Sequence, residues 1–446
     1  MQERFARVVM RAIGVVLLAV CAGYGASANA QLSITVRQYS ERPLPIAIVP
    51  FGWQGQGEPA YDLAAVVTAD LASSGRFAPL PVADMVSRPT EPTQVNFRDW
   101  RLVQVDNLVI GRLVEEGPDR YTAIFQLFNV LSGEQLIGFR LTAGRNDLRA
   151  TAHRIADMIY EELTGIPGVF STQIAYVSEE RRDDGTRRFR LIVADADGEN
   201  ARVIADSPQP LMSPTWSPDG RRIAYVSFEG EQSAIYVQTL RTGTRERVSA
   251  RPGINGAPAF SPDGRQLALT LSQGQGNLDI YTLDLGTQVL RQLTNDAAID
   301  TEPAWSPDGR FIYFTSDRAG SAQVYRVPAE PGGRVERVTY QGVYNARPRL
   351  SPDGRQLAVV HGLGNNVFRI ALVDIASGRP LVLTDGRLDE SPSFAPNGAQ
   401  IIYATRSNGR GVLASTSTDG RIQTEIGSVA GDVREPVWGP YPRPGT

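Results

Sequence analysis

The chain is poor in the residues from which catalytic and metal centres are usually built. Its 446 residues include one cysteine, Cys21, and two histidines, His153 and His361. No serine stands in the Gly-x-Ser-x-Gly context of a nucleophile elbow. Two histidines so far apart in the sequence predict neither a metal cluster nor a catalytic triad. We therefore expect no enzyme, no bound metal and no cofactor.

Neither sign of charge dominates the composition. The chain has 45 Lys and Arg residues against 48 Asp and Glu residues, a formal net charge of −3, and every basic residue is an arginine. Nonspecific nucleic-acid binding needs a basic face. We therefore expect no nucleic acid among the partners.

The long apolar run of this chain lies at the N-terminus, which resembles an export signal. A basic start, an apolar run and a small-x-small cleavage site follow one another: Arg4, Arg7 and Arg11, residues 12–22, and Ala28-Asn29-Ala30. The run is too short to anchor the chain in a bilayer. We expect residues 1–30 to be removed, which leaves a soluble, cysteine-free chain with no membrane span. Lipid attachment at Cys21 is less favoured, because Val20 is bulkier than the small residue of a lipoprotein signal.

What the chain does contain is the phrase Pro-x-aromatic-Ser-Pro-Asp-Gly, repeated with small variations. Its copies begin at Pro214, Pro258, Pro303, Pro348 and Pro392, and a shortened copy begins at Pro436. Successive lead prolines are 44 or 45 positions apart. Each full copy is followed by a short run rich in β-branched and aromatic residues: 223–227, 267–271, 311–315, 357–361 and 401–405. A period near 45 with strand-like filling is typical of propeller blades of four strands.

The two ends of the repeat array complement each other. Residues 174–178 read as the first strand of a unit that has no phrase before it, and residues 436–438 are a phrase with no strands after it. The pattern predicts an all-β six-bladed propeller over residues 170–440, closed when the C-terminal strand joins the strands near Ile174. Closing the circle removes sheet edges.

The region before the propeller, residues 44–166, has mixed signals and predicts an α/β domain. We expect strands at 44–50, 108–110, 121–127 and 135–139, a helix from Pro59 to near Gly75, and a second helix from Asp147 to Gly165. Residues 31–43 fit either a detachable N-terminal arm or an edge strand of this domain.

The residues just before each phrase are the candidates for binding, because they vary while the phrase does not. The candidates at this propeller mouth are Met212, Ser213, Asn255, Ala257, Thr301, Glu302, Asn345, Arg347, Asp389, Glu390 and Arg434. Their mixture of acids, arginines and amides suits a peptide or protein partner. An equally weighted alternative is that Glu302, Glu390 and Glu435 pair with Arg347 and Arg434 and join adjacent blades.

Two further groups receive structural interpretations. The phrase tryptophans, Trp216, Trp305 and Trp438, fall at blade-core positions, which favours packing over a glycan-binding platform. The carboxylate pairs Asp183-Asp184 and Asp195-Ala-Asp197 lie in turn-like sequence and are interpreted as solvated loops.

This domain order, with the linker Leu163-Thr-Gly-Ile-Pro167 and the stretch Ser207-Pro-Gln-Pro-Leu-Met-Ser-Pro214, resembles the TolB family of the Tol-Pal system of Gram-negative bacteria. The resemblance spans essentially the whole chain after the signal. It implies a non-enzymatic, monomeric periplasmic adaptor that supports outer-membrane integrity and constriction during cell division.

The resemblance also implies two partners at two sites. The propeller mouth would bind the lipoprotein Pal, and the arm at residues 31–43 would bind the inner-membrane protein TolA through Leu32, Ile34, Val36 and Tyr39. Other Tol-Pal or outer-membrane proteins are further candidates. The alternative function is a glycan- or peptide-binding periplasmic propeller outside the Tol-Pal system.

Overall fold

The computed structural model describes residues 36–38, 42–230, 232–272, 277–427 and 431–442. The expected signal at residues 1–30 and the arm residues Leu32, Ile34 and Tyr39 lie outside the described residues. None of the helices in the described part of the chain combines the length and the apolar character needed to cross a membrane.

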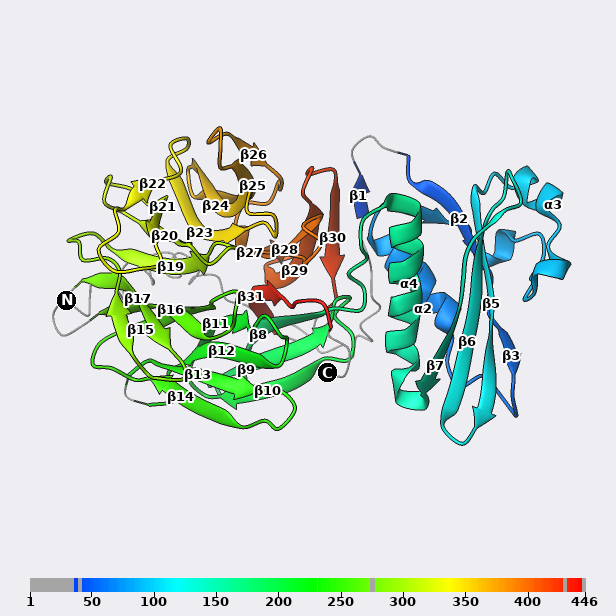
Figure 1. The fold of residues 1–446 in the computed structure, drawn as a ribbon, viewed down its shortest axis with the longest axis horizontal. Coiled ribbons are helices and arrows are strands. Elements are labelled where there is room, and N and C mark those ends of the chain that lie inside the picture. The colour runs from blue at the N-terminus through cyan, green and yellow to red at the C-terminus, as the bar shows by residue number, and fades with distance from the viewer. Residues whose placement is uncertain (1–35, 39–41, 231, 273–276, 428–430, 443–446) are drawn as a thin grey trace. The chain divides into compact units, whose positions relative to one another are not determined.

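The first folded region is a mixed sheet in the order β4-β2-β5-β6-β7, with β3 paired to β5 (Figure 1). The strands are β2 (Leu44–Ile48), β3 (Gly52–Gln54), β4 (Phe77–Pro79), β5 (Asn107–Gly117), β6 (Arg120–Asn129) and β7 (Gln135–Gly144). The helices are α2 (Leu63–Ser73), α3 (Phe97–Leu102) and α4 (Leu148–Thr164), with 3-10 turns at Val82–Asp84, Pro92–Gln94 and Arg145–Asp147. The expected strands are all present.

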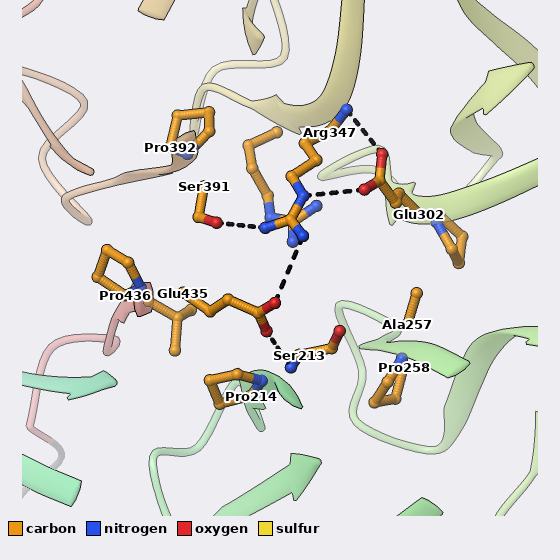
Figure 2. Close-up of a pocket in the computed structure, with 13 residues that line it drawn as sticks. Ser213, Pro214, Ala257, Pro258, Glu302, Arg347, Ser391, Pro392, Glu435 and Pro436 are labelled. Carbon is orange, nitrogen blue, oxygen red and sulfur yellow. Dashed lines mark hydrogen bonds and ion pairs between the residues drawn. The ribbon is translucent and has the colours of Figure 1, made fainter. Parts of the chain in front are cut away.

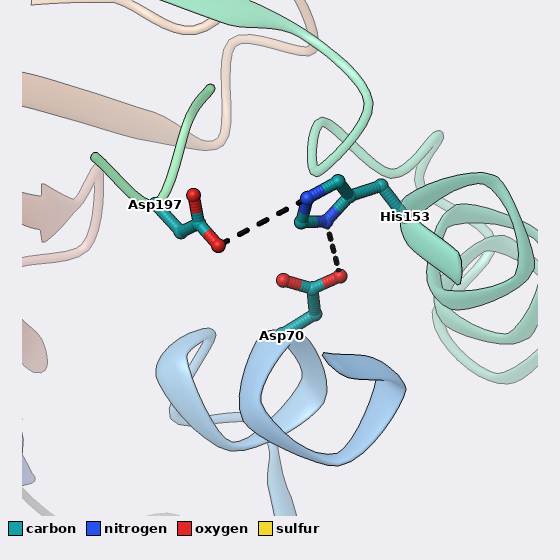
Figure 3. Close-up of side chains that lie close together, drawn as sticks. All are labelled: Asp70, His153 and Asp197. Atoms are coloured by element: carbon teal, nitrogen blue, oxygen red, sulfur yellow. Dashed lines mark hydrogen bonds and ion pairs between the residues drawn. The ribbon is translucent and has the colours of Figure 1, made fainter. Parts of the chain in front are cut away.

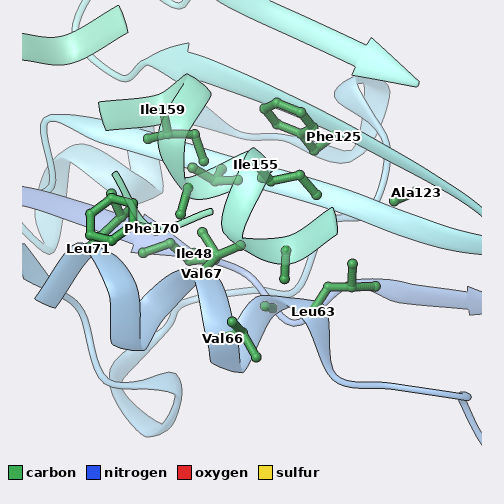
Figure 4. Close-up of a cluster of buried hydrophobic side chains, with 14 of the residues drawn as sticks. Ile48, Leu63, Val66, Val67, Leu71, Ala123, Phe125, Ile155, Ile159 and Phe170 are labelled. Carbon is green, nitrogen blue, oxygen red and sulfur yellow. The ribbon is translucent and has the colours of Figure 1, made fainter. Parts of the chain in front are cut away.

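The two faces of this sheet bury different cores. Alternate residues of β5 point to opposite faces, so Val109 and Leu113 join one core while Leu108 and Ile110 join the other. Helices α2 and α4 cover the first face, where their apolar sides pack on Phe125 (Figure 4). Trp100 of α3 is fully buried in the second core.

The first helix begins later than its sequence predicts. Pro59 was expected to open it, but α2 begins at Leu63. Asp62 is the N-cap, and its carboxylate accepts a hydrogen bond of 3.0 Å from the Ala65 amide. An N-cap carboxylate satisfies an amide that has no partner within the helix, so Asp62 outweighs the preference of proline for a first turn.

Six sheets follow, one for each blade, and each contains the four strands of that blade, which confirms the six-bladed propeller. Blade one is β31 (Asp432–Trp438), β8 (Gln173–Arg181), β9 (Arg187–Asp195) and β10 (Arg202–Ser207); blade two is β11 (Leu211–Trp216), β12 (Arg222–Ser227), β13 (Ala234–Thr239) and β14 (Arg245–Ser249); blade three is β15 (Asn255–Phe260), β16 (Gln266–Ser272), β17 (Leu278–Asp284) and β18 (Leu290–Gln292). Blade four is β19 (Asp300–Trp305), β20 (Phe311–Ser316), β21 (Gln323–Pro328) and β22 (Glu336–Arg337); blade five is β23 (Tyr344–Leu350), β24 (Gln356–Gly364), β25 (Val367–Asp374) and β26 (Pro380–Val382); blade six is β27 (Glu390–Phe394), β28 (Gln400–Ser407), β29 (Arg410–Ser417) and β30 (Ile422–Ile426).

The C-terminal strand closes the ring as predicted. β31 pairs antiparallel with β8, with Arg434 opposite Val177 and Trp438 opposite Ile174. The Trp438 indole is buried and donates a 2.8 Å hydrogen bond to the Thr172 hydroxyl. The first and last strands of the propeller in the sequence, β8 and β31, therefore share blade one.

The Ser-Pro-Asp-Gly phrase forms one turn in blade after blade. The Ser217 hydroxyl donates to Asp219 at 2.5 Å and accepts from the Arg222 amide at 2.9 Å, and Gly220 takes a positive φ of 70°. Hydrogen bonds of this kind hold the pKa of the equivalent Asp308 down at about 2, mainly through Ser306. The repeated aspartates therefore shape turns.

The short strand β1 (Val36–Gln38) joins the propeller. It pairs antiparallel with β30, with Val36 opposite Thr424 and Gln38 opposite Ile422, and becomes a fifth strand of blade six. The interpretation of this segment as an edge strand of the α/β sheet is therefore wrong for residues 36–38. β30 offers an edge whose backbone groups need partners, and β1 supplies them.

Candidate functional site at the propeller mouth

Each innermost strand of the propeller carries an irregularity just before its lead proline. The register of β11 shifts between Met212 and Thr215, and the other five innermost strands shift at the same place. The residue before each lead proline takes a left-handed conformation, with φ between 46° and 58°: Ser213, Ala257, Glu302, Arg347, Ser391 and Glu435. Non-glycine residues adopt this conformation rarely, and a bulge re-aims a side chain.

These six residues, called the ring residues below, line one cavity together with five of the lead prolines (Figure 2). The cavity also contains Arg349 and Val437. Its volume is about 40 Å³, far below the roughly 300–1,000 Å³ of small-molecule sites. A cavity of this volume holds a few water molecules and is too small to enclose a sugar or a nucleotide.

Arg347 fills the centre of the cavity and contacts three other blades. Its guanidinium donates to Glu302 at 2.9 Å and to Glu435 at 3.4 Å, and it also donates to the Ser391 hydroxyl. The second Glu435 oxygen accepts the backbone amide of Ser213. One arginine thus joins ring residues of blades one, four, five and six (Figure 2).

The electrostatics of the ring are balanced. Burial lowers the pKa of Arg347, but the carboxylates of Glu435 and Glu302 outweigh burial and hold that pKa above its ordinary value. Burial lowers the pKa of the neighbouring Arg349 below its ordinary value. Two arginines face two glutamates, so the cavity presents neither a cationic nor an anionic pole.

Four of the predicted mouth residues line the cavity: Ser213, Ala257, Glu302 and Arg347. Met212, Thr301, Glu390 and Arg434 lie beside ring residues but outside the lining; Glu390 is exposed, and Arg434 pairs with Glu179 at 3.0 Å. The alternative that acids and arginines join adjacent blades is therefore correct in part: Glu302 and Glu435 do pair with Arg347, while Arg434 pairs with Glu179 and Glu390 shows no ion pair among the contacts described. Partner binding at the mouth stays a prediction.

Three predicted mouth residues are buried inside the blades and do not reach the opening. Asn255 and Asn345 are 0% exposed, and Asp389 is 1% exposed. The Asn345 amide donates to Gln323 at 2.9 Å and to the Gln341 carbonyl at 2.8 Å, and Asp389 accepts from Thr405 at 2.6 Å. Each lies three residues before a lead proline, where the side chain points into the blade.

The lining also contains Ser391, Glu435 and Arg349. Ser391 and Glu435 belong to the segments before the lead prolines that the sequence indicates as the mouth, and each stands directly before a lead proline like the four candidates that line the cavity. Arg349 follows its lead proline, and nothing in the repeat distinguishes it from residues that face outward.

A second polar cluster lies away from the channel and brings together His153 and the Asp195-Ala-Asp197 turn. His153 of α4 contacts Asp70 of α2, with 2.7 Å between Nδ1 and the carboxylate, and faces Asp195 and Asp197 of blade one (Figure 3). Arg149, one turn earlier on α4, pairs with Asp197. His153 is thus not isolated, and Asp195-Ala-Asp197 is not simply a solvated loop. The described residues include a histidine and carboxylates close enough for a metal, but Arg149 already neutralises Asp197, and we assign no metal there.

Comparisons with known proteins agree with this architecture. The model of the TolB amino-terminal domain matches residues 32–136, and the model of the TolB beta propeller domain matches residues 160–442. The Tol-Pal system protein TolB of Xanthomonas euvesicatoria is 49% identical over 413 residues, 92% of this chain and 93% of that protein. Its counterpart in Xanthomonas oryzae is 48% identical over the same shares.

A solved structure shares the fold at full length. The crystal structure of TolB from Acinetobacter baumannii superposes with a TM-score of 0.84 at 40% sequence identity, covering 92% of this chain and all of that one. Domain order, the six closed blades and these similarities lead to one conclusion: the chain belongs to the TolB family of Tol-Pal system proteins.

Proposed function

We propose that this protein is a non-enzymatic periplasmic adaptor of the Tol-Pal system, with one partner at the propeller mouth and another at the N-terminal arm. Membership of the family supports a role in the Tol-Pal system and hence partners within it. The export signal expected at residues 1–30 agrees with the periplasm. In this role the protein supports outer-membrane integrity and constriction during cell division.

The mouth is the proposed site for the lipoprotein Pal. The observation that carries this proposal is the ring of six left-handed residues, one from each blade, around a cavity of about 40 Å³. A cavity so small favours a partner that covers the opening over a ligand that enters it. Mixed polar groups beside the exposed Glu390 and the partly buried Met212 suit a protein surface.

The arm at residues 31–43 is the proposed site for TolA. Only three of its residues, 36–38, pair with β30 in the described structure. A pairing of three residues is short enough to exchange for another partner, and strand addition is a recurring mode of peptide recognition. Leu32, Ile34, Val36 and Tyr39 remain the proposed contacts.

The glycan-binding alternative finds no support in the tryptophans. Trp216 and Trp438 are buried, and the Trp305 indole donates to the Ala259 carbonyl of the preceding blade at 3.1 Å. The proposed adaptor acts as a monomer, without nucleic acid.

A pull-down from periplasmic extract tests both partners at once. Ala257→Arg adds a charged, bulky side chain to the mouth at a ring residue with no side-chain hydrogen bond to lose, and Ala376→Arg in the exposed β25–β26 turn is the matched control. A chain that starts at Leu44 lacks the arm. We expect Ala257→Arg alone to lose Pal and the truncation alone to lose TolA. Capture of neither protein by the unmodified chain would reject the adaptor.

A further inference from the structure

The His153 cluster, defined as Asp70, Arg149, His153, Asp195 and Asp197, joins three elements. Asp70 comes from α2, and Arg149 and His153 come from one face of α4. Asp195 ends β9, and Asp197 lies in the turn that follows. The cluster is therefore a contact between the α/β domain and blade one (Figure 3).

One ring nitrogen in this cluster has no partner. His153 is 2% exposed, and its Nδ1 is held by Asp70. Its Nε2 is buried and makes no hydrogen bond. The Nε2 atom lies 3.8 Å from a carboxylate oxygen of Asp195 and 3.9 Å from one of Asp197. A buried nitrogen without a partner is costly unless something satisfies it.

The groups around His153 include more carboxylates than cations. Asp70 lies on one side, Asp195 and Asp197 lie on the other, and Asp157 lies one turn further along α4. Asp157 is occupied, because it accepts the backbone amides of Phe170 and Ser171. Arg149 is the one cation among the groups described around the ring, and it pairs with Asp195 and Asp197.

A proton suits this place better than a metal ion. Arg149 already contacts the carboxylate oxygens that would have to bind a metal, and a divalent cation there would face the guanidinium. A proton on Nε2 adds one positive charge, turns the free nitrogen into a donor aimed at two carboxylates, and displaces nothing.

We propose that His153 is a proton-controlled contact between the two domains: protonated, it bridges Asp70 to the Asp195–Asp197 turn, and deprotonated, it leaves mutually repelling carboxylates that loosen the interface. This role is independent of which proteins the mouth and the arm bind.

The pKa shifts in the cluster support the proposal and determine whether the contact is gained or lost as the pH rises. Burial lowers the pKa of His153, but the hydrogen bond and charge of Asp70 and the charge of Asp197 hold it above its ordinary value of 6.5. Burial raises the pKa of Asp70 to about 6. Because both pKa values are raised, the cluster binds more protons when the two domains are in contact than when its residues are separated. The contact is therefore complete below pH 6.5, and it is lost as the pH rises through the pKa of His153.

The position of the cluster links it to the arm. Asp70 lies one helical turn before Ser73, whose carbonyl accepts a 3.1 Å hydrogen bond from Thr424 of β30. Thr424 is opposite Val36 of β1. A change in how α2 meets the propeller therefore reaches the strand that holds the arm.

Titration of the histidines by NMR, in protein labelled only at histidine, tests the proposal directly. The chain has only two histidines, so His361 serves as an internal reference for folding. We expect His153 to titrate above the ordinary pKa and Asp197→Asn to lower that pKa. Asp184→Asn, in the exposed β8–β9 turn, is the control and should leave it unchanged. A wild-type pKa at or below the ordinary value, or one insensitive to Asp197→Asn, would overturn the proposal.

A distance measurement tests the mechanical part. Cysteines introduced for exposed Leu102 and Val289 carry spin labels on the two domains. We expect the distance distribution to broaden between about pH 6 and about pH 9, and His153→Gln, which cannot take the extra proton, to remove that dependence. A distance distribution that does not change with pH in the wild type would contradict a proton-controlled contact. In the NMR experiment, loss of the His153 signals from their original positions on addition of stoichiometric Zn²⁺ would contradict it as well.

Discussion

Arg347 is the residue on which the polar network of the channel depends. It is the only described cation paired with Glu302 and Glu435, whose side chains are 23% and 13% exposed. Replacing it by methionine removes the ion-pair partner of both carboxylates and leaves Arg349 as the remaining arginine of the cavity lining. We expect Arg347→Met to lower the free energy of unfolding by about 2–3 kcal/mol, measured by urea denaturation.

The matched control for this change is Arg379→Met, which removes an exposed arginine in the same blade. Surface substitutions of this kind change stability by roughly 0.5 kcal/mol or less. Equal losses for the two variants would mean that the channel network contributes nothing specific.

Asn397 stands where the other full copies of the phrase have an aspartate, and its amide makes a contact that an aspartate could not make. Its side-chain amide donates to the Pro167 carbonyl at 2.9 Å, a contact with the segment that leads into the propeller. Asn397→Asp restores the repeated residue but replaces the donor by an acceptor. We expect a loss of about 1 kcal/mol in urea denaturation. A free energy of unfolding equal to or above that of the wild type would show that the contact does not stabilise the protein.

Local turns could be predicted from the sequence, whereas side-chain directions at bulges and contacts between distant residues could not. The turn at Ser217-Pro-Asp219 is local, because its hydrogen bonds join residues two to five positions apart, and the repeat therefore predicted every blade. Which of Asn345 and Arg347 faces the channel depends on a bulge that the strand pattern does not record. The partners Asp70 and His153 are 83 positions apart, and no local rule connects them.

At the scale of elements, β1 is held by a short pairing, because only three of its residues pair with β30. A chain that starts at Leu44 lacks β1 and leaves the outer edge of β30 open. We expect faster amide hydrogen exchange in β30 (Ile422–Ile426) and unchanged exchange in β14 (Arg245–Ser249), the outer strand of blade two.

Unchanged exchange in β30 after this truncation would show that β1 is not paired there in solution. The sequence predicted a strand-like segment here but could not choose its neighbour, since an exposed edge on either domain satisfies the same backbone groups. The start of α2 is a similar case, because Pro59 and Asp62 are both good signals for the first turn and only the cap geometry separates them.

At the scale of the whole molecule, the ring depends on the closure of blade one. Trp438 is 7% exposed, its indole donates to Thr172, and its backbone amide donates to Ser393 of blade six. We expect Trp438→Ala to cost about 3–5 kcal/mol of unfolding free energy.

Trp305→Ala removes the same phrase residue from a blade that the chain does not close, and it is the control. Trp305 is more exposed than Trp438, so its loss should cost less. A larger loss for Trp305→Ala in urea denaturation would contradict the importance of closure.

The central claim of the adaptor hypothesis is that Pal contacts the propeller mouth. Ala257 faces the cavity there, beside Ser213 and Glu302 (Figure 2). The measurement that tests it is photo-crosslinking in cells, with a photoreactive amino acid at position 257 and, separately, at the control position 376. The account predicts a covalent adduct with Pal from position 257 and none from position 376. No Pal adduct from position 257, or equal adducts from both positions, would contradict it.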